Sequence, residues 1–114
     1  MIDTTYERRA YKRINKGFSA ILQPEQLGGF QDMITLRDLS CGGASFFSSS
    51  KLAQGAIANM KITLIPNKPS VECRARVLRS GVERSRELFP TAVQFIDIDA
   101  AQKSRIEDLI ESLS

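Results

Sequence analysis

The first segment that could do chemistry is an arginine pair near the N-terminus, Arg9-x-x-x-Arg13, which Arg8 precedes. Arginine carries a planar fork of donors that can grip a phosphate or the O6/N7 edge of guanine, and its flat face stacks on bases. Two such forks could hold two parts of one small ligand. The alternative is a solvated basic segment, loosely attracted to anything acidic, because this spacing is common by chance.

A second segment, Asp38-x-Ser40-x-x-Gly43, combines three residue types that suit a nucleotide. Aspartate can accept paired hydrogen bonds from the N1–H and N2–H edge of guanine, and a serine hydroxyl can bond a base or a phosphate. Glycine lets the backbone approach a ligand closely. The alternative is an Asx-type turn with a Gly-Gly reversal that satisfies only its own backbone.

The charge of the chain is concentrated around the arginine pair. Residues 7–16 hold five of the 16 Lys and Arg and one of the 13 Asp and Glu, a local balance of 5 − 1 = +4 within a total of +3. The rest of the chain therefore carries +3 − 4 = −1. A local excess of this kind favours one anionic ligand over a coating of anionic polymer.

The composition argues against an enzyme, a metal site or a bound cofactor. Histidine, the commonest general base, is absent, so neither a Ser-His nor a Cys-His nucleophile can form. The two cysteines, Cys41 and Cys73, form no CxxC pair, and without histidine the usual zinc-ligand sets cannot assemble. We expect both to be free thiols in a reducing compartment.

Length and hydropathy predict one cytoplasmic domain. A chain of 114 residues is the size of a single domain. Its first seven residues lack the basic segment and apolar run of a secretory signal, and no apolar stretch approaches the ~20 residues that span a bilayer. We therefore expect no membrane insertion.

Alternating apolar residues predict a β-barrel. Six strands are expected, at residues 18–23, 31–39, 44–47, 57–65, 71–80 and 88–98. Pro24 should stop the first strand, and short turns should join most of the others. Six short strands at such spacing predict a closed or nearly closed antiparallel barrel. Leu36 and Leu39 cannot both face its core on an unbroken pleat, so we expect a bulge or turn near Asp38.

The end of the chain changes to a helical period. One apolar stripe contains Ile106, Leu109, Ile110 and Leu113, and Asp99 with Gln102 forms a capping-box pattern. We expect this helix to pack on the barrel; alternatively, part of its stripe docks on a partner protein or on a second copy of the chain, as a homodimer. The predicted parts are a flexible basic arm at 1–17, the barrel at 18–98 and the helix at 99–114.

Both segments resemble motifs of the PilZ domain, a bacterial receptor module for cyclic di-GMP. Residues 7–13, Glu-Arg-Arg-Ala-Tyr-Lys-Arg, look like its RxxxR motif, and residues 38–43, Asp-Leu-Ser-Cys-Gly-Gly, look like its (D/N)xSxxG motif. The order of the motifs, their separation and the strand between them agree with the family. The resemblance implies a six-stranded antiparallel barrel with a C-terminal helix.

The resemblance also implies a ligand role for each motif residue. Arg9 and Arg13 would contact guanine and phosphate, with Arg8 as a supporting cation. Asp38 and Ser40 would bind a guanine edge. Gly43 would let the ligand approach the backbone. Some members of the family carry an aromatic side chain on a later strand as a stacking platform, and we take Arg79 as its substitute.

The function implied is that of a non-catalytic cyclic di-GMP receptor or adaptor that signals through an unidentified effector protein. An arm with so little apolar content would order only when ligand binds, since ordering and contact energies are comparable. One alternative is a small barrel that binds nucleic acid, although the six phenylalanines form no evident stacking row. The other is an interaction module that binds no nucleotide.

Overall fold

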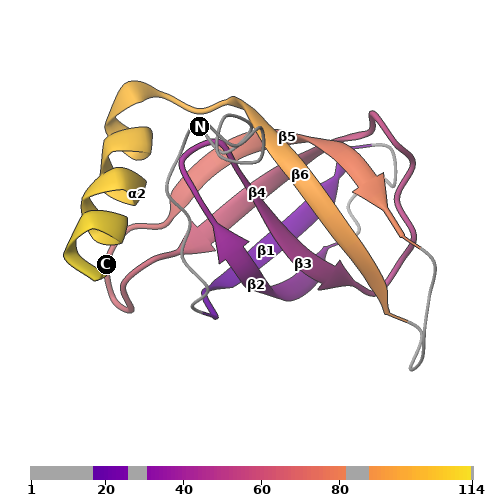
Figure 1. The fold of residues 1–114 in the computed structure, drawn as a ribbon, viewed down its shortest axis with the longest axis horizontal. Coiled ribbons are helices and arrows are strands. Elements are labelled where there is room, and N and C mark those ends of the chain that lie inside the picture. The colour runs from indigo at the N-terminus through magenta and orange to yellow at the C-terminus, as the bar shows by residue number, and fades with distance from the viewer. Residues whose placement is uncertain (1–16, 26–30, 82–87, 114) are drawn as a thin grey trace, which may run out of the picture.

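The protein, described as a computed structural model, forms six strands and one helix over the described residues 17–25, 31–81 and 88–113 (Figure 1). The elements are β1 (Ser19–Pro24), β2 (Asp32–Leu39), β3 (Gly43–Ser48), β4 (Ile57–Thr63), β5 (Val71–Ser80), β6 (Phe89–Asp97) and α2 (Ala100–Leu113). The strands follow the order β1-β2-β3-β6-β5-β4 and close into a barrel because β1 pairs with β4. The predicted fold class, an antiparallel six-stranded barrel with one C-terminal helix, is confirmed.

Alternation along each strand separates the core from the surface. In β4, the side chains of Ala58, Met60 and Ile62 are buried, whereas those of Asn59 and Lys61 are exposed. This is the predicted period of a half-buried strand. Burying each large apolar side chain contributes about 1.5–3 kcal/mol, so the inward-facing rows of the barrel dominate its stability.

Three hydroxyl groups lie at the barrel end where β3 and β5 finish. The hydroxyl oxygens of Ser48 and Thr91 are 3.0 Å apart, and those of Ser80 and Thr91 are 3.2 Å apart. Ser48 also donates to the Ser50 carbonyl at 2.7 Å. These buried groups are therefore hydrogen-bonded within the barrel, as buried polar groups must be to avoid a desolvation penalty.

Helix α2 stands at the opposite end of the barrel (Figure 1). The backbone N–H of Gln102 donates to Asp99 Oδ1 at 2.8 Å, so Asp99 is the predicted N-cap. Ile106 and Ile110 are buried in the barrel core, which confirms that the helix packs on the barrel. No helix within the described ranges has the length and apolar character needed to cross a bilayer.

Most strands differ from their predicted bounds by one or two residues at an end, and two of these differences have a physical reason or consequence. Strand β1 includes Pro24, which lies opposite Ala58 in β4, although we expected the strand to stop before it. Proline is tolerated there because the pairing of β1 with β2 ends at Leu22, so Pro24 has a paired strand on one side only, as on an edge strand. Strand β3 begins at Gly43, opposite Gln94, one residue earlier than predicted.

Candidate functional site

The predicted irregularity near Asp38 is a β-bulge in β2. Leu36 lies opposite Phe46 in β3, but the next pair is Asp38 with Ser45, so Arg37 is the extra residue. Leu36 and Leu39 are both buried, Arg37 is exposed and Asp38 is half-buried. The bulge thus keeps both leucines in the core and turns two consecutive polar side chains outward, as bulges next to binding sites often do.

The carboxylate of Asp38 is oriented by the neighbouring strand. The hydroxyl of Ser45 donates to Asp38 Oδ2 at 2.9 Å, and the two residues are register partners. A hydrogen bond of this length to a carboxylate fixes the direction of the side chain. Asp38 therefore presents a positioned acceptor on the outer face of the barrel.

Ser40 holds the turn between β2 and β3. Its hydroxyl oxygen accepts the Gly42 N–H at 3.1 Å, and the hydroxyl also donates to the Gly43 carbonyl at 3.4 Å. The backbone N–H of Ser40 donates to the same carbonyl at 2.9 Å. Much of the polar capacity of Ser40 is thus used inside the turn, the pattern typical of serine in turns.

Gly43 is required by the packing of two strands. A Cβ atom at this position would lie 2.2 Å from the backbone carbonyl oxygen of Val93 in β6, far inside van der Waals contact. The adjacent Gly42 carbonyl accepts the Phe95 N–H at 3.0 Å. The motif turn is therefore joined to β6, a structural role for Gly43 that sequence reasoning missed because β6 lies some fifty residues away.

Arg79 lies at a second bulge, in the same register row as Asp38. Val77 pairs with Val93 and Arg79 pairs with Ala92, so Leu78 is the extra residue of β5. Ala92 in turn pairs with Ser45, the partner of Asp38. Arg79 is exposed and stands three strands from Asp38, a separation of roughly 14 Å at the usual strand spacing.

A hollow of about 440 Å³ lies beside the first bulge, lined by Gly17, Leu36, Arg37 and Asp38. The guanidinium carbon of Arg37 lies over the ring of Phe47, 4.9 Å from its centroid. Sequence reasoning missed Arg37 and Phe47. The spacing of Leu36 and Leu39 that predicted the bulge could have found Arg37, because a bulge there turns both intervening residues outward.

The residues Arg8, Arg9 and Arg13 lie outside the described residues, so the predicted role of the arm stays a prediction.

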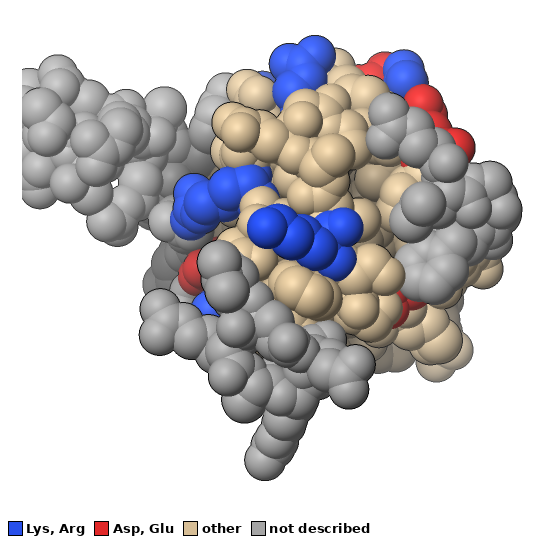
Figure 2. Space-filling view, turned by 90° about the vertical axis from the view of Figure 1, so that its right-hand side faces the viewer, with Lys and Arg blue, Asp and Glu red and all other residues tan. Residues whose placement is uncertain are grey.

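On the barrel end remote from α2, Lys and Arg side chains stand out on a largely uncharged surface (Figure 2). A basic surface attracts anions and speeds their association. This distribution is compatible with an anionic ligand on the barrel itself.

Both cysteines are free, as predicted, and the structure shows that both are buried. The pKa of the Cys41 thiol is raised mainly by burial and to a smaller extent by the neighbouring Glu107 carboxylate. The thiol donates to Glu107 Oε2 at 3.7 Å. The pKa of Cys73 is raised to about 12, mainly by burial and to a smaller extent by the charge of Asp97. Both thiols are therefore protonated at neutral pH, and Cys41 joins the motif turn to helix α2.

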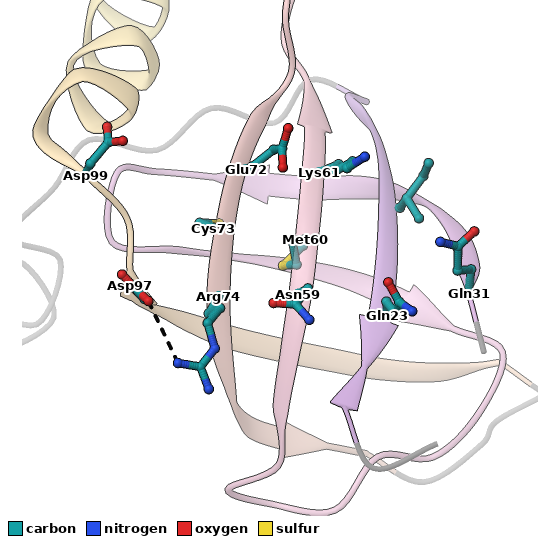
Figure 3. A pocket seen from close by; sticks show the side chains of 11 residues that line it. Gln23, Gln31, Asn59, Met60, Lys61, Glu72, Cys73, Arg74, Asp97 and Asp99 are labelled. Carbon is teal, nitrogen blue, oxygen red and sulfur yellow. Dashed lines mark ion pairs between the residues drawn. The ribbon is translucent and has the colours of Figure 1, made fainter. Parts of the chain in front are cut away.

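A second hollow, of about 420 Å³, lies on the outer face of β1, β4 and β5 (Figure 3). Its lining is polar and includes the side chains of Gln23, Asn59, Lys61, Glu72 and Arg74. Within the described ranges, no three Cys, Asp or Glu side chains gather so that they could hold a metal ion.

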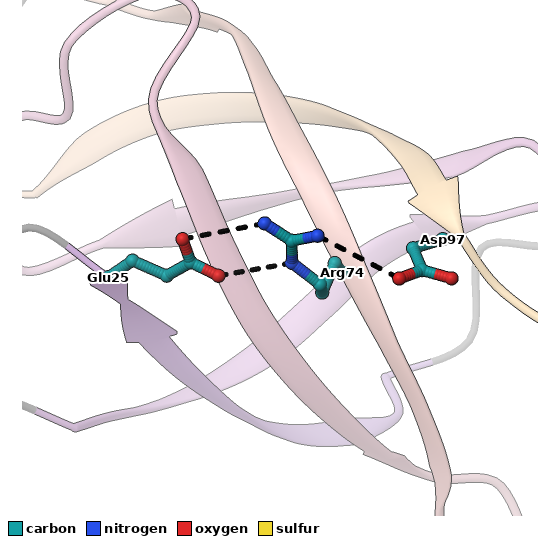
Figure 4. A network of polar contacts seen from close by, with 3 residues as sticks. All are labelled: Glu25, Arg74 and Asp97. Carbon is teal, nitrogen blue, oxygen red and sulfur yellow. Dashed lines mark hydrogen bonds and ion pairs between the residues drawn. The ribbon is translucent and has the colours of Figure 1, made fainter.

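Arg74 in this second hollow is held by two carboxylates (Figure 4). Its Nε donates to Glu25 Oε2 at 3.0 Å, and its Nη1 lies 3.8 Å from Asp97 Oδ2. A second bond to Glu25, at 3.5 Å, makes that contact bidentate. The pairing commits the donors of Arg74 to the protein and ties β1, β5 and β6 together on this side of the barrel.

A closed six-stranded antiparallel barrel followed by one helix, with a bulge that presents an aspartate ahead of a Ser-x-x-Gly turn, defines a small all-β domain with an outward-facing polar site. The chain belongs to the PilZ domain family, whose model matches residues 7–112. The resemblance seen in the sequence is thereby confirmed. Among curated protein sequences, none matches this chain.

Solved structures with the same fold include three that share little sequence with this chain. The inhibitor of motility MotI/DgrA of Bacillus subtilis has a TM-score of 0.76 at 19% identity, covering 93% of this chain and 51% of its own. The PilZ domain with c-di-GMP of YcgR from Escherichia coli has a TM-score of 0.70 at 16% identity, covering 93% and 91%. The K. pneumonia MrkH–c-di-GMP complex has a TM-score of 0.71 at 17% identity, covering 93% and 52%.

The chain spans about half the length of the motility inhibitor and of MrkH. At these identities the likeness establishes a shared fold.

Proposed function

We propose that this chain is a non-catalytic receptor for cyclic di-GMP, which binds between the segment before Gly17 and the bulged strands. The observation that carries the proposal is the β2 bulge, which turns Asp38 outward beside a hollow that begins at Gly17. Membership of the PilZ family and the c-di-GMP complexes of YcgR and MrkH support the choice of ligand.

Chain connectivity brings the two motifs within reach of each other. Arg13 precedes Gly17 by four residues, so its Cα lies at most roughly 14 Å from Gly17 even in an extended chain. Gly17 and Asp38 line the same hollow. The arginines could therefore bind the guanine and phosphate groups of a ligand whose other guanine edge is held by Asp38, with Arg8 as a supporting cation.

Ser40 can reach the ligand by exchanging one weak contact. Its donor bond to the Gly43 carbonyl is long, at 3.4 Å, and such bonds contribute little. A ligand acceptor could take over this hydroxyl proton while the Gly42 N–H continues to fix the oxygen. Gly43, whose missing side chain makes room for the Val93 carbonyl, would act by holding the turn against β6.

Arg79 would act at the far side of the ligand. The register row from Asp38 to Arg79 passes through Ser45 and Ala92. Both are small residues, so the surface between the two bulged strands is low. The roughly 14 Å between the ends suits a ligand with two bases rather than one. Arginine at this place could stack on the second guanine or bind its phosphate.

The receptor would signal by ordering its arm. Fixing a backbone residue costs about 1–2 kcal/mol, and a bidentate arginine–guanine contact returns on the order of 1–3 kcal/mol. These terms are comparable, so ligand binding would decide whether the arm docks on the barrel. The ordered arm would create or hide a surface that an effector protein reads.

Titration calorimetry of the full chain tests the ligand. We expect saturable binding of cyclic di-GMP that Arg9→Ala and Asp38→Ala each weaken strongly, with GTP and a short oligonucleotide as comparison ligands and Arg74→Ala as the matched control. Oligonucleotide binding that collapses with salt and ignores sequence would favour the nucleic-acid alternative. A barrel that is folded yet binds none of the three ligands would be an interaction module.

Hydrogen exchange tests the switch separately. We expect cyclic di-GMP to increase protection across residues 6–16 relative to the free chain. Unchanged protection despite calorimetric binding would reject arm ordering and leave the receptor function standing.

A further inference from the structure

We propose that Arg37, seated on Phe47, is a stacking platform for a guanine base of the ligand, an inference that rests on the proposed function. Neither residue belongs to the two sequence motifs. Arg37 is the residue that the bulge adds to β2, next to Asp38 in the lining of the same hollow. In a chain without tryptophan, this platform would add a stacking surface to the one proposed for Arg79.

The contact with Phe47 gives Arg37 a defined orientation. At 4.9 Å, the guanidinium carbon lies well within the roughly 6 Å at which a cation is attracted to a ring face. Phe47 is 41% exposed and Arg37 is exposed, so the pair stands on the outer surface. The guanidinium carbon lies over the ring and the Arg37 side chain is exposed, so the side of the group away from the ring is open to a ligand.

Within the described part of the chain, the donors of Arg37 are not committed to the protein. Among the described residues, no hydrogen bond or ion pair joins its guanidinium to another side chain or to the backbone. The ring contact therefore positions the group without using its N–H donors. An arginine that is positioned by a ring and still able to donate is suited to a nucleotide more than to a structural role.

The carboxylate of Asp38, next to Arg37, would orient a bound guanine base. Asp38 points to Ser45 and Arg37 to Phe47, and these two partners are two residues apart on β3, about 7 Å along the strand. A guanine whose N1–H and N2–H edge is bound by Asp38 would extend from the carboxylate over the guanidinium. Asp38 would then choose the base by its edge, and Arg37 would hold it by its face.

Stacking on Arg37 predicts a different response from a charge contact. A lysine keeps the positive charge but has no plane, so Arg37→Lys should fail to restore binding. Stacking is tolerant of base identity, so loss of Arg37 should weaken cyclic di-GMP and cyclic di-AMP by similar factors. Loss of Asp38 should instead reduce the preference for guanine.

The test is calorimetry of the full chain with both cyclic dinucleotides, together with the fall in guanine ultraviolet absorbance on stacking. We expect Arg37→Ala to weaken cyclic di-GMP about five- to thirtyfold and Phe47→Leu about two- to fivefold. Arg37→Lys should resemble Arg37→Ala in affinity and in its diminished absorbance change. Arg74→Ala serves as the control for removing an exposed arginine, and thermal melts verify folding.

Two results would overturn the inference while the receptor function survives. Wild-type affinity in Arg37→Ala, alongside weakened binding in Asp38→Ala, would remove Arg37 from the site. Full recovery in Arg37→Lys would show a point charge rather than a stack. If wild-type protein binds no cyclic di-GMP at all, the proposed function fails and this inference falls with it.

Discussion

Arg37 and Arg74 occupy two hollows of nearly equal size, about 440 and 420 Å³, and use their guanidinium groups in different ways. The donors of Arg74 bind Glu25 and Asp97, whereas the guanidinium carbon of Arg37 lies over the ring of Phe47. The volume of a hollow therefore does not select a binding site on this barrel. The better guide is whether its polar groups are oriented but still able to bond a ligand.

The two hollows also differ in the strands beneath them. Beneath the second hollow, β4 pairs with β1 and with β5 without a break, and the register shift between β5 and β6 adds only the apolar Ile96 beside Asp97. Beneath the first hollow, the β2 bulge delivers Arg37 and Asp38 side by side. A cation and an anion on one outer face can meet the donor and acceptor groups of one ligand.

The largest expected difference between the hollows is in ligand binding. Asp38→Ala should weaken cyclic di-GMP by roughly 10- to 100-fold, because hydrogen bonds to a charged group contribute about 1.5–3 kcal/mol. Glu72→Ala, which removes a carboxylate from the second hollow, should leave the affinity unchanged. Calorimetry of both variants measures this, and equal losses would abolish the distinction between the hollows.

The next effect concerns the backbone under the motif turn. Gly43→Ala should lower the free energy of unfolding by about 1–3 kcal/mol, because its Cβ would press on the Val93 carbonyl and drive β3 from β6. Gly17→Ala is the matched variant, since its Cβ would meet only a side-chain methyl of Thr35, at 3.1 Å. Urea unfolding compares them; equal stability would mean that the strands can shift freely.

A smaller, pH-dependent effect is expected under the second hollow. Cys73 has a folded pKa of about 12 against an ordinary value of 9.0, so its contribution to stability is full below pH 9 and is lost as pH rises toward 12. Relative to Cys73→Ala, the wild type should lose up to about 1 kcal/mol per pH unit in that window. If the free energy of unfolding has the same pH dependence in both proteins, ionisation of Cys73 does not destabilise the folded state.

The smallest effect should follow from Arg74→Ala. Its ion pairs lie on the surface, with the side chains of Arg74, Glu25 and Asp97 exposed by 43%, 38% and 69%. Exposed pairs contribute about 0–1 kcal/mol, and salt screens them further. Thermal melts at low and high salt should therefore differ little from wild type. A large loss would instead identify this network as a main support of the barrel.

Much of the fold could be predicted because its signals are local. The alternation of Ala58, Met60 and Ile62 predicts the inner face of β4. The spacing of Leu36 and Leu39 predicts the bulge without any knowledge of strand pairing. Likewise, Asp99 could be recognised as an N-cap from its place before the helical stripe. Each of these features depends on residues within one element.

The parts that sequence reasoning missed depend on pairing between distant strands. Phe47 meets Arg37 only because β3 lies against β2 in one particular register, and Gly43 is confined by Val93 in β6. The hydroxyl of Ser40 looked like a ligand group, but its bonds within the turn appear only once the backbone is folded. Register is a property of the assembled barrel, so no single segment reveals it.

The extra residues at the bulges of β2 and β5 have a consequence for chain length. Removing Arg37 from β2 would leave Leu36, Asp38 and Leu39 in plain alternation, and removing Leu78 from β5 would do the same for Val77, Arg79 and Ser80. A single-residue deletion is thus predicted to straighten either strand without moving one core side chain to the surface. Inserting one residue at a bulge position can thus add a polar site to the outer surface of this barrel, and deleting it can remove the site, while the core side chains stay in place.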